Sequence, residues 1–380
     1  MRHWLGFLLG ALLLNGCARM PNAPSTGEPV GTTKSATDSS KAPPATAPIV
    51  IPQRSDPPAP AGPASGSTSG SASSSTSAPI GASVARGVST GTAVVNGTKL
   101  YYEIAGPPTT EVLVFLHQFS LDSRMWDEQF YEFARAYRVL RYDARGFGRS
   151  GPIEGAYSVR DDLRALLDHL AISRAHLIGL SMGARYATDF ALVNPQRVRS
   201  LVLVDPTVSG LAFSPIFAGE FQRALTAGRA GRIAEAKRYW LASSLFATTR
   251  ERSDVMARVR TMLGDYSGWH FAHEDPASAL NPLAARRLSQ VRPPTLLVVG
   301  ERSHPDAIAM AARLYREIPL ARRVVIKEVG HLPNMESPAA FNRALTEFLT
   351  NPPTIRAVDN ARVPGPAPCI DAKTKQPAPC

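Results

Sequence analysis

Residues 179–183 constrain this chain more than any other segment, because they read Gly-Leu-Ser-Met-Gly between two segments of different periodicity. Residues 175–180 form an apolar run typical of a short buried strand, and residues 184–194 have the pattern of a helix that ends at Pro195. A strand must therefore turn directly into a helix at Ser181. Glycine on both sides permits this turn, since a Cβ there would collide with the neighbouring strand or helix, and the serine Oγ is left exposed on a strained backbone. The segment thus predicts Ser181 as a nucleophile.

A serine hydroxyl is a weak nucleophile at neutral pH, so this interpretation requires a histidine base on a loop after a later strand. His331 meets the requirement. It follows the apolar run 323–326 and precedes a helix that starts near Pro338, where a proline in the first turn is a normal start signal. An isolated loop histidine usually has no catalytic role; Ser181 upstream makes His331 the predicted general base.

The third requirement is a pair of backbone amides for a tetrahedral oxyanion, one after the nucleophile and one on the loop after an earlier strand. These amides belong to Met182 and Phe119. The second follows the apolar run 111–117, which ends in a polar loop. We expect His117, at the end of this run, to hold the loop in place rather than to act in catalysis.

The arrangement of the remaining segments predicts an α/β fold. Residues 92–95 and 99–104 flank Asn96–Gly97, the strongest short signal for an antiparallel hairpin. Strand-like runs then begin near 111, 138, 175, 200, 294 and 323, and they alternate with helical stretches such as 159–170. This alternation is typical of a mostly parallel sheet with helices on both faces, whose active site lies at the carboxyl ends of the strands.

The alternation stops between residues 206 and 290, where several stretches look helical and none looks like a central strand. We interpret this region as a helical cap over the site. Its aromatic residues could line a pocket for an apolar acyl or ring group, or could form the core of the cap; they are Phe213, Phe217, Phe221, Tyr239, Trp240, Phe246, Tyr266, Trp269 and Phe271. Within the segment 268–275, Trp269 is the candidate for substrate contact.

Four motifs in this order resemble the α/β-hydrolase superfamily over about residues 88–350: 117–126, 140–150, 179–183 and 330–334. Within the superfamily they are similar to the branch that contains enol-lactonases of the 3-oxoadipate type, cofactor-free haloperoxidases or perhydrolases, and small esterases. The resemblance implies an eight-stranded, mostly parallel sheet with an inserted helical cap, a Ser-His-acid triad and no cofactor.

Gln118 departs from the family pattern, which has glycine after the first histidine. The oxyanion loop would then be less free in its backbone angles, and the geometry of the Phe119 amide is less certain.

The acid of the triad is the larger departure. The family places an Asp three residues beyond the glycine that ends the strand 294–300, and Ser303 stands at that position. A triad needs a carboxylate to orient the imidazole and to stabilise the imidazolium. Asp205, at the end of the preceding strand, is one candidate, as in haloalkane dehalogenases; Asp306, further along the same loop, is the alternative. A Ser-His dyad, or a site without catalysis, would remain if neither reaches His331.

Two other interpretations of the polar residues are disfavoured. His304 and Glu301 share a loop, but their spacing matches no zinc pattern, so we expect no metal. Residues 143–150 lack both the spacing and the lysine of a phosphate loop, and we expect them to be structural. The net charge of +11 and the pI near 9.9 come from dispersed arginines without a basic cluster, which indicates attraction to anionic envelope surfaces rather than nucleic-acid binding.

Outside the catalytic core, 88–205 and 291–350, the sequence predicts an export route. Residues 1–16 resemble a bacterial lipoprotein signal peptide, with a short apolar run ending before Cys17, the predicted lipid-bearing residue. Residues 17–87 are rich in Pro, Ala, Ser, Thr and Gly, as in a disordered tether. The resemblance places the anchor in the outer membrane, with the domain in the periplasm or at the surface. Residues 351–380 form a Pro-rich tail whose Cys369 and Cys380 could form a disulfide, or remain free or pair between molecules.

The sequence therefore predicts an exported, lipid-anchored serine hydrolase that cleaves a small carboxylic ester or lactone through an acyl-enzyme. Perhydrolase chemistry and hydrolysis of amide or C–C bonds use the same triad and stay open. The alternative from another class is a non-catalytic binding module that has lost its acid, for which the discriminating feature is whether either Asp reaches His331. The substrate, the oligomeric state and the physiological partner do not follow from the sequence.

Overall fold

The computed structural model describes residues 87–353, 369–370 and 377–378. An antiparallel hairpin of β1 (Ser89–Val95) and β2 (Thr98–Ala105) opens the fold. Its two turn residues, Asn96 and Gly97, have φ of 46° and 70°. Positive φ at both positions is the geometry of a type I′ turn, whose twist matches that of the strands. The predicted hairpin is therefore confirmed.

Eight strands form one sheet in the order β1-β2-β4-β3-β5-β6-β7-β8. β2 pairs antiparallel with both β1 and β4, and strands β3 to β8 run parallel to one another. The parallel strands are β3 (Val112–Leu116), β4 (Arg138–Tyr142), β5 (Ala175–Leu180), β6 (Val198–Val204), β7 (Thr295–Gly300) and β8 (Ala321–Ile326). This is the predicted fold class, with each strand near its expected position.

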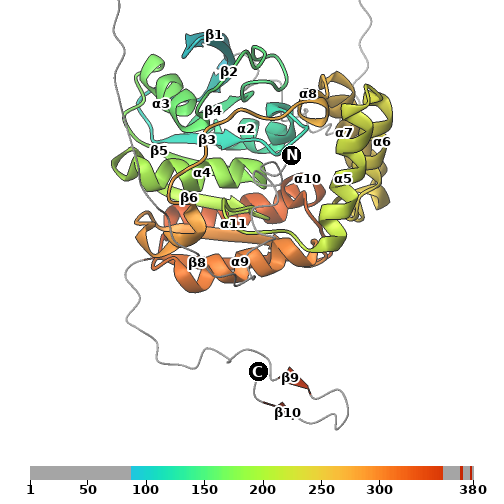
Figure 1. The fold of residues 1–380 in the computed structure, drawn as a ribbon. Helices are drawn as coiled ribbons and strands as arrows, with labels where there is room; N and C mark the ends of the chain where they lie inside the picture. The colour runs from blue at the N-terminus through green and yellow to red at the C-terminus, as the bar shows by residue number, and fades with distance from the viewer. Residues whose placement is uncertain (1–86, 354–368, 371–376, 379–380) are drawn as a thin grey trace, which may run out of the picture. The chain divides into compact units, whose positions relative to one another are not determined.

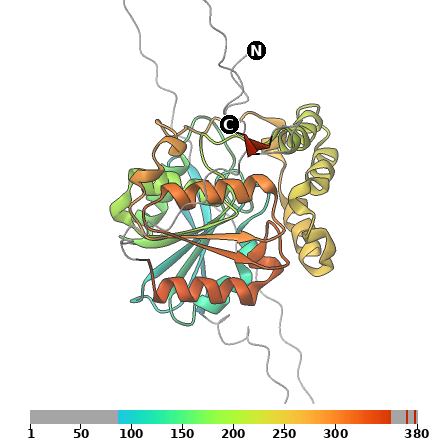
Figure 2. The same ribbon diagram turned by 90° about the horizontal axis from the view of Figure 1, so that it is seen from below.

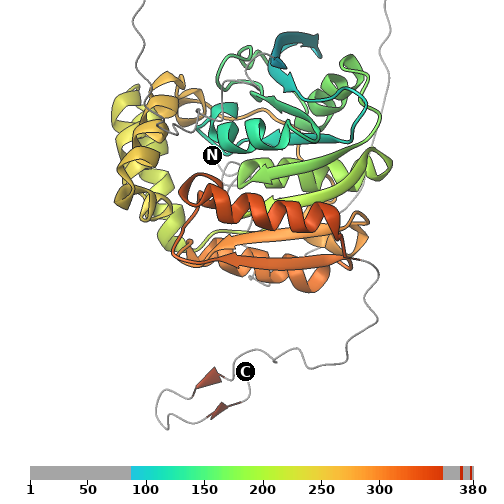
Figure 3. The same cartoon turned by 180° about the vertical axis from the view of Figure 1, so that it is seen from behind.

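Helices cover both faces of the sheet. Figures 1 and 3 show α3 (Val159–His169), α4 (Met182–Val193) and α9 (Pro305–Glu317) on one face, and α2 (Asp127–Phe133) and α11 (Pro338–Thr350) on the other. In Figure 2, α9 and α11 lie on opposite sides of the strands. Every residue of β3, β5 and β7 is buried, as expected for parallel strands covered on both sides.

Four helices between β6 and β7 form the cap: α5 (Pro215–Arg229), α6 (Ile233–Ala242), α7 (Ser253–Asp265) and α8 (Trp269–Ala272). They stand together at one end of the sheet (Figure 1). Most of the aromatic residues predicted for this region form the interior of the cap, because Phe217, Phe221, Trp240, Phe246, Tyr266 and Phe271 are all buried. The cap core, rather than a pocket wall, is thus the main role of these side chains.

The remaining elements are short. Single turns of 3-10 helix occur at η2 (Ser123–Trp126), η3 (Pro195–Arg197), η4 (Ser244–Phe246), η5 (Thr249–Glu251), η6 (Ala284–Arg286) and η7 (Leu288–Gln290), and α10 spans Pro333–Glu336. Strands β9 (Cys369–Ile370) and β10 (Pro377–Ala378) pair with each other in a separate sheet. Within the described residues, no helix combines the length and the apolar character needed to cross a membrane. The signal peptide, Cys17, nearly all of the tether and Cys380 lie outside the described residues.

Candidate active site

Four neighbouring strands, β5 to β8, each end in a loop that supplies one side chain to the candidate site. Ser181 follows β5, Asp205 follows β6, Ser303 lies just after β7, and His331 lies after β8. The carboxyl ends of parallel strands meet at one edge of a sheet. All four residues are buried, with exposed fractions of 8 %, 0 %, 7 % and 2 % in that order.

The backbone at Ser181 has the strained geometry predicted for it, with φ 53° and ψ −107°. Strain of this kind in a residue other than glycine is concentrated at functional sites. The two flanking glycines are required for close packing: a Cβ on Gly183 would lie 2.2 Å from the carbonyl oxygen of Leu116, and one on Gly179 would lie 2.3 Å from the carbonyl of Gly183. The turn therefore holds the start of α4 directly against the end of β3.

Asp205 reaches His331. The Nδ1–H of His331 donates to Oδ2 of Asp205 over 3.2 Å, and the amide of Gly300 donates to the other carboxylate oxygen over 3.3 Å. Asp205 itself has a positive φ of 38°, a second strained residue in the site. With Nδ1 as the donor, Nε2 of His331 carries the lone pair, and this buried atom has no hydrogen-bond partner among the described residues. The imidazole is thus held in the tautomer that a general base needs.

Asp306 does not occupy the same position. Its carboxylate accepts hydrogen bonds from the backbone amide and the hydroxyl of Ser214, at 2.8 and 2.9 Å, just before α5 begins. Ser303, at the position where the resemblance implies an acid, instead donates to Asp205. Of the two predicted candidates, the structure brings Asp205 and not Asp306 to His331.

The loop after β3 carries Phe119, and His117 holds this loop in place. Nδ1–H of His117 donates to the carbonyl of Gln118 over 2.8 Å, and Nε2 accepts from the amide of Ala144 over 2.9 Å. Gln118 does not adopt a positive φ, so this position does not require glycine; the positive φ in this loop is at Ser120, two residues later, with 69°. Met182 is the first residue of α4, where backbone amides lack intrahelical partners and can bind an anion.

The ring of Phe119 joins the loop to the cap. It packs edge-on against Phe221, Trp240 and Phe271, with ring centroids 5.7, 5.4 and 5.5 Å away. The indole N–H of Trp240 also donates to the hydroxyl of Ser120 over 2.7 Å. Cap and oxyanion loop are therefore packed together as one unit.

Trp269, the predicted substrate contact, faces a different neighbourhood. Its ring stacks on His273 with 4.8 Å between centroids, and it packs against a small apolar cluster that contains Ile153 and Tyr157. The residue is absent from the lining of the cavity described below. Substrate contact by Trp269 stays a prediction.

The next residue, His270, is a buried neutral histidine. Burial lowers its pKa to about 3, and the charge of Arg185 adds to this effect. The hydroxyl of Tyr266 and Nδ1 of His270 are hydrogen-bonded over 2.7 Å, and the imidazole stacks on Phe147 with 4.4 Å between centroids. Unlike His331, it is bonded to a tyrosine and not to a carboxylate in the described part of the chain, so it does not share the geometry of the His331–Asp205 pair.

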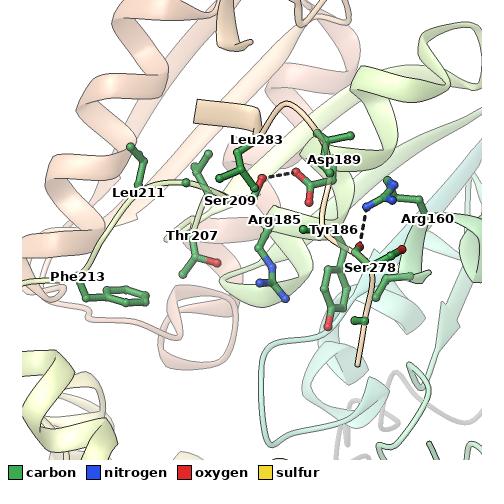
Figure 4. A pocket seen from close by; sticks show the side chains of 16 residues that line it. Arg160, Arg185, Tyr186, Asp189, Thr207, Ser209, Leu211, Phe213, Ser278 and Leu283 are labelled. Carbon is green, nitrogen blue, oxygen red and sulfur yellow. Dashed lines mark hydrogen bonds between the residues drawn. The ribbon is translucent and has the colours of Figure 1, made fainter. Parts of the chain in front are cut away.

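A cavity of about 60 Å³ lies between α4, the loop after β6 and the segment that returns from the cap (Figure 4). Arg160, Arg185 and Asp189 line it, together with Thr207 and Ser209. Figure 4 shows two hydrogen bonds here: the hydroxyl of Ser209 donates to the carboxylate of Asp189, and the guanidinium of Arg160 donates to the carbonyl of Ser278. Burial raises the pKa of Asp189.

This cavity adjoins the elbow. The hydroxyl of Thr207, which lines the cavity, donates to the carbonyl of Ser181 over 3.0 Å, although Ser181 itself is outside the lining. Arg185 was missed by the sequence analysis. Its position in the sequence could have indicated it, because Arg185 is the fourth residue after Ser181 and therefore lies on the same face of α4.

The comparisons with known proteins agree with this fold. Residues 111–338 match the model of the protein family described as "alpha/beta hydrolase fold". The chain therefore belongs to the α/β-hydrolase family, and it is an enzyme of the hydrolase class.

One curated relative and two solved structures show which hydrolases the chain is similar to. A 2-hydroxy-6-oxononadienedioate/2-hydroxy-6-oxononatrienedioate hydrolase from Cupriavidus pinatubonensis is 31 % identical over 227 residues, which cover 57 % of this chain and 78 % of the relative. The crystal structure of a hydrolase from Pseudomonas aeruginosa has a TM-score of 0.60 at 29 % identity, covering 68 % of this chain and 98 % of the other. The enol-lactonase from Burkholderia xenovorans LB400 has a TM-score of 0.57 at 27 % identity, covering 68 % and 100 %.

Proposed function

We propose that this chain is a serine hydrolase that cleaves a small carboxylic ester or lactone through an acyl-enzyme. The observation that carries the proposal is the hydrogen bond from His331 to a fully buried Asp205. Asp205 follows β6, the strand next to β5, and β5 leads into the strained Ser181. A non-catalytic module would have no need to keep this pair buried together, because burying an ionisable pair costs free energy. The similarity to an enol-lactonase supports the same class of substrate.

In the proposed reaction, Nε2 of His331 takes the proton of Ser181 as Oγ attacks the carbonyl carbon. Asp205 stabilises the imidazolium that forms. The amides of Met182 and Phe119 donate to the oxyanion, and the proton on His331 then passes to the leaving oxygen. Water then attacks the carbonyl carbon of the acyl-enzyme and gives a proton to Nε2 of His331. The proton passes to Oγ of Ser181 as the carboxylic acid is released. Because the acyl-enzyme is covalent, a fluorophosphonate probe should label the protein on Ser181, and short p-nitrophenyl esters should be turned over. A protein that shows neither result would be the binding module.

A second candidate reaction is hydrolysis of a carbon–carbon bond in a substrate that carries carboxylates. Two observations favour it: the relative from Cupriavidus pinatubonensis is named for a dioate, and Arg160 and Arg185 both line the cavity beside Ser181. Guanidinium groups bind carboxylates by charge-assisted hydrogen bonds. Turnover of 2-hydroxy-6-oxononadienedioate at a higher kcat/KM than any simple ester would select this candidate, and no turnover would exclude it.

Carboxylate binding in this cavity predicts a preference for acidic substrates that depends on Arg185. Arg185→Met should raise KM about 10- to 100-fold for a half-ester such as mono-p-nitrophenyl glutarate, since one charged hydrogen bond is lost. The KM for neutral p-nitrophenyl butyrate should change little. Steady-state kinetics on both esters measure the difference, and Arg164→Met, an exposed arginine paired with Asp161 on α3, is the matched control. An equal effect of Arg185→Met on both esters would contradict carboxylate binding in this cavity.

We also propose that the enzyme is exported and anchored by lipid on Cys17. The support is the sequence alone: the apolar segment before Cys17 and the long polar tether after it. A thioether-linked diacylglycerol, with further acylation, would give stable anchoring, which a single chain does not. The full chain expressed in a bacterium should partition into the detergent phase of Triton X-114 and incorporate labelled palmitate, and Cys17→Ser should lose both properties. Palmitate labelling that survives in Cys17→Ser would refute the assignment.

A further inference from the structure

Ser303 contacts the carboxylate of the Asp205–His331 pair, and the reaction described above gives it no role. Its hydroxyl donates to Oδ2 of Asp205 over 2.5 Å, the same oxygen atom that accepts from His331. The other oxygen, Oδ1, accepts from the amide of Gly300 over the longer distance of 3.3 Å. One carboxylate oxygen thus lies between the serine hydroxyl and the imidazole.

The loop that carries Ser303 is fastened to the loop that carries His331. The amide of Arg302 donates to the carbonyl of Val329 over 2.8 Å, and the amide of Ser303 turns back to Gly300 over 3.1 Å. A Cβ on Gly300 would lie 2.3 Å from the carbonyl oxygen of Gly330, so the two loops pack backbone to backbone. The hydroxyl is therefore held at a fixed place relative to the imidazole.

The hydrogen bond from Ser303 to Asp205 is buried, which makes its loss costly. Asp205 has no exposed surface and Ser303 is 7 % exposed, so water does not replace a missing donor there easily. Burying a carboxylate is costly unless it is hydrogen-bonded, and a donor held in a fixed place favours one direction of the carboxylate. Without Ser303, Oδ2 would keep one donor instead of two, and rotation of the carboxylate away from Nδ1 would be less opposed.

We propose that Ser303 is a positioning residue of the catalytic machinery: it orients Oδ2 of Asp205 toward Nδ1 of His331 and acts on the reaction only through that carboxylate. The proposal rests on the proposed serine-hydrolase function. It also accounts for a hydroxyl at the position where the resemblance implies an acid, because the group there supports a carboxylate supplied by the neighbouring strand.

The test is a double-mutant cycle in the full chain. Ser303→Ala should lower kcat on p-nitrophenyl butyrate about 10- to 100-fold, as expected for loss of a hydrogen bond to a charged group, with KM changed by less than about 2-fold. In an Asp205→Asn background, the same substitution should cost less than about 2-fold, because the carboxylate through which it acts is already gone. Ser303→Thr, which keeps the hydroxyl, should restore most of kcat. Ser214→Ala is the matched control, since it removes a hydroxyl from the carboxylate of Asp306, away from His331.

The outcomes distinguish an error in the proposed serine-hydrolase function from an error in the role of Ser303. If wild-type protein neither turns over esters nor reacts with the fluorophosphonate, the proposed function is wrong and the role of Ser303 is lost with it. If the wild type is active and Ser303→Ala is equally so, only the role of Ser303 is overturned. Equal losses from Ser303→Ala in both backgrounds would show a structural role instead. Thermal melting of every variant checks folding, and Ser303→Thr decides the matter if Ser303→Ala does not fold.

Discussion

Replacing Ser181 with alanine is expected to abolish ester hydrolysis, lowering kcat by about 10⁵- to 10⁶-fold, the loss typical of a serine nucleophile in a complete triad. The size of the effect follows from the covalent step: without Oγ there is no acyl-enzyme, and His331 and the oxyanion amides have no bound alkoxide to act on. Hydrolysis of p-nitrophenyl butyrate, with active-site titration by a fluorophosphonate, measures both the rate and the labelled fraction.

This substitution leaves the fold of the elbow in place. The structural hydrogen bonds at Ser181 are made by its backbone, from its amide to the carbonyl of Val204 and to its carbonyl from Arg185 and Thr207. The melting temperature of the variant should therefore stay close to that of the wild type. A folded Ser181→Ala protein that keeps its turnover, or that is still labelled, would place the nucleophile elsewhere.

Asp205→Asn should lower kcat about 10⁴-fold, the second largest effect, with little change in KM. An asparagine amide in this place can donate to Nδ1, which favours the tautomer that carries its proton on Nε2. That tautomer cannot accept a proton from Ser181, and the imidazolium also loses its stabilising charge. The kcat of the variant, measured with the same ester at several pH values, reports both losses.

The matched control is Asp306→Asn. Because the Asp306 carboxylate bonds Ser214 and not His331, its replacement should leave kcat within about 3-fold of the wild type. A large loss in Asp306→Asn together with an active Asp205→Asn would reverse the assignment of the acid. Far-ultraviolet circular dichroism separates either result from misfolding, which matters because Asp205 is fully buried.

Sequence patterns predicted the fold because they depend on local rules. The Asn96–Gly97 turn requires two residues that tolerate positive φ, and the continuous apolar runs at β5 and β6 require a sheet covered on both faces. The strained turn at Ser181 was predicted for the same reason, because a direct turn from strand to helix requires a pattern in five consecutive residues. Such features need no knowledge of distant contacts.

The acid could not be settled in this way. Asp205 and Asp306 both follow parallel strands, and which one meets His331 depends on loop direction in three dimensions. Asp306 lies in the first turn of α9, where its carboxylate faces Ser214 at the base of the cap. The cavity arginines escaped prediction for a related reason, since Arg160 comes from α3 and Arg185 from α4. Long-range packing of helices brings them together, and no local pattern records it.

If the Phe119 amide binds the oxyanion as proposed, Phe119 would couple the cap to the turnover rate. The backbone of this residue carries a proposed oxyanion donor, while its ring lies among Phe221, Trp240 and Phe271 of the cap. Two sites joined by one residue are thermodynamically linked, and linkage is reciprocal: a ligand that orders the cap favours the loop position that binds an oxyanion, and a transition-state analogue should tighten the cap by the same free energy. Exchanging the cap to change substrate preference would therefore alter kcat as well as specificity.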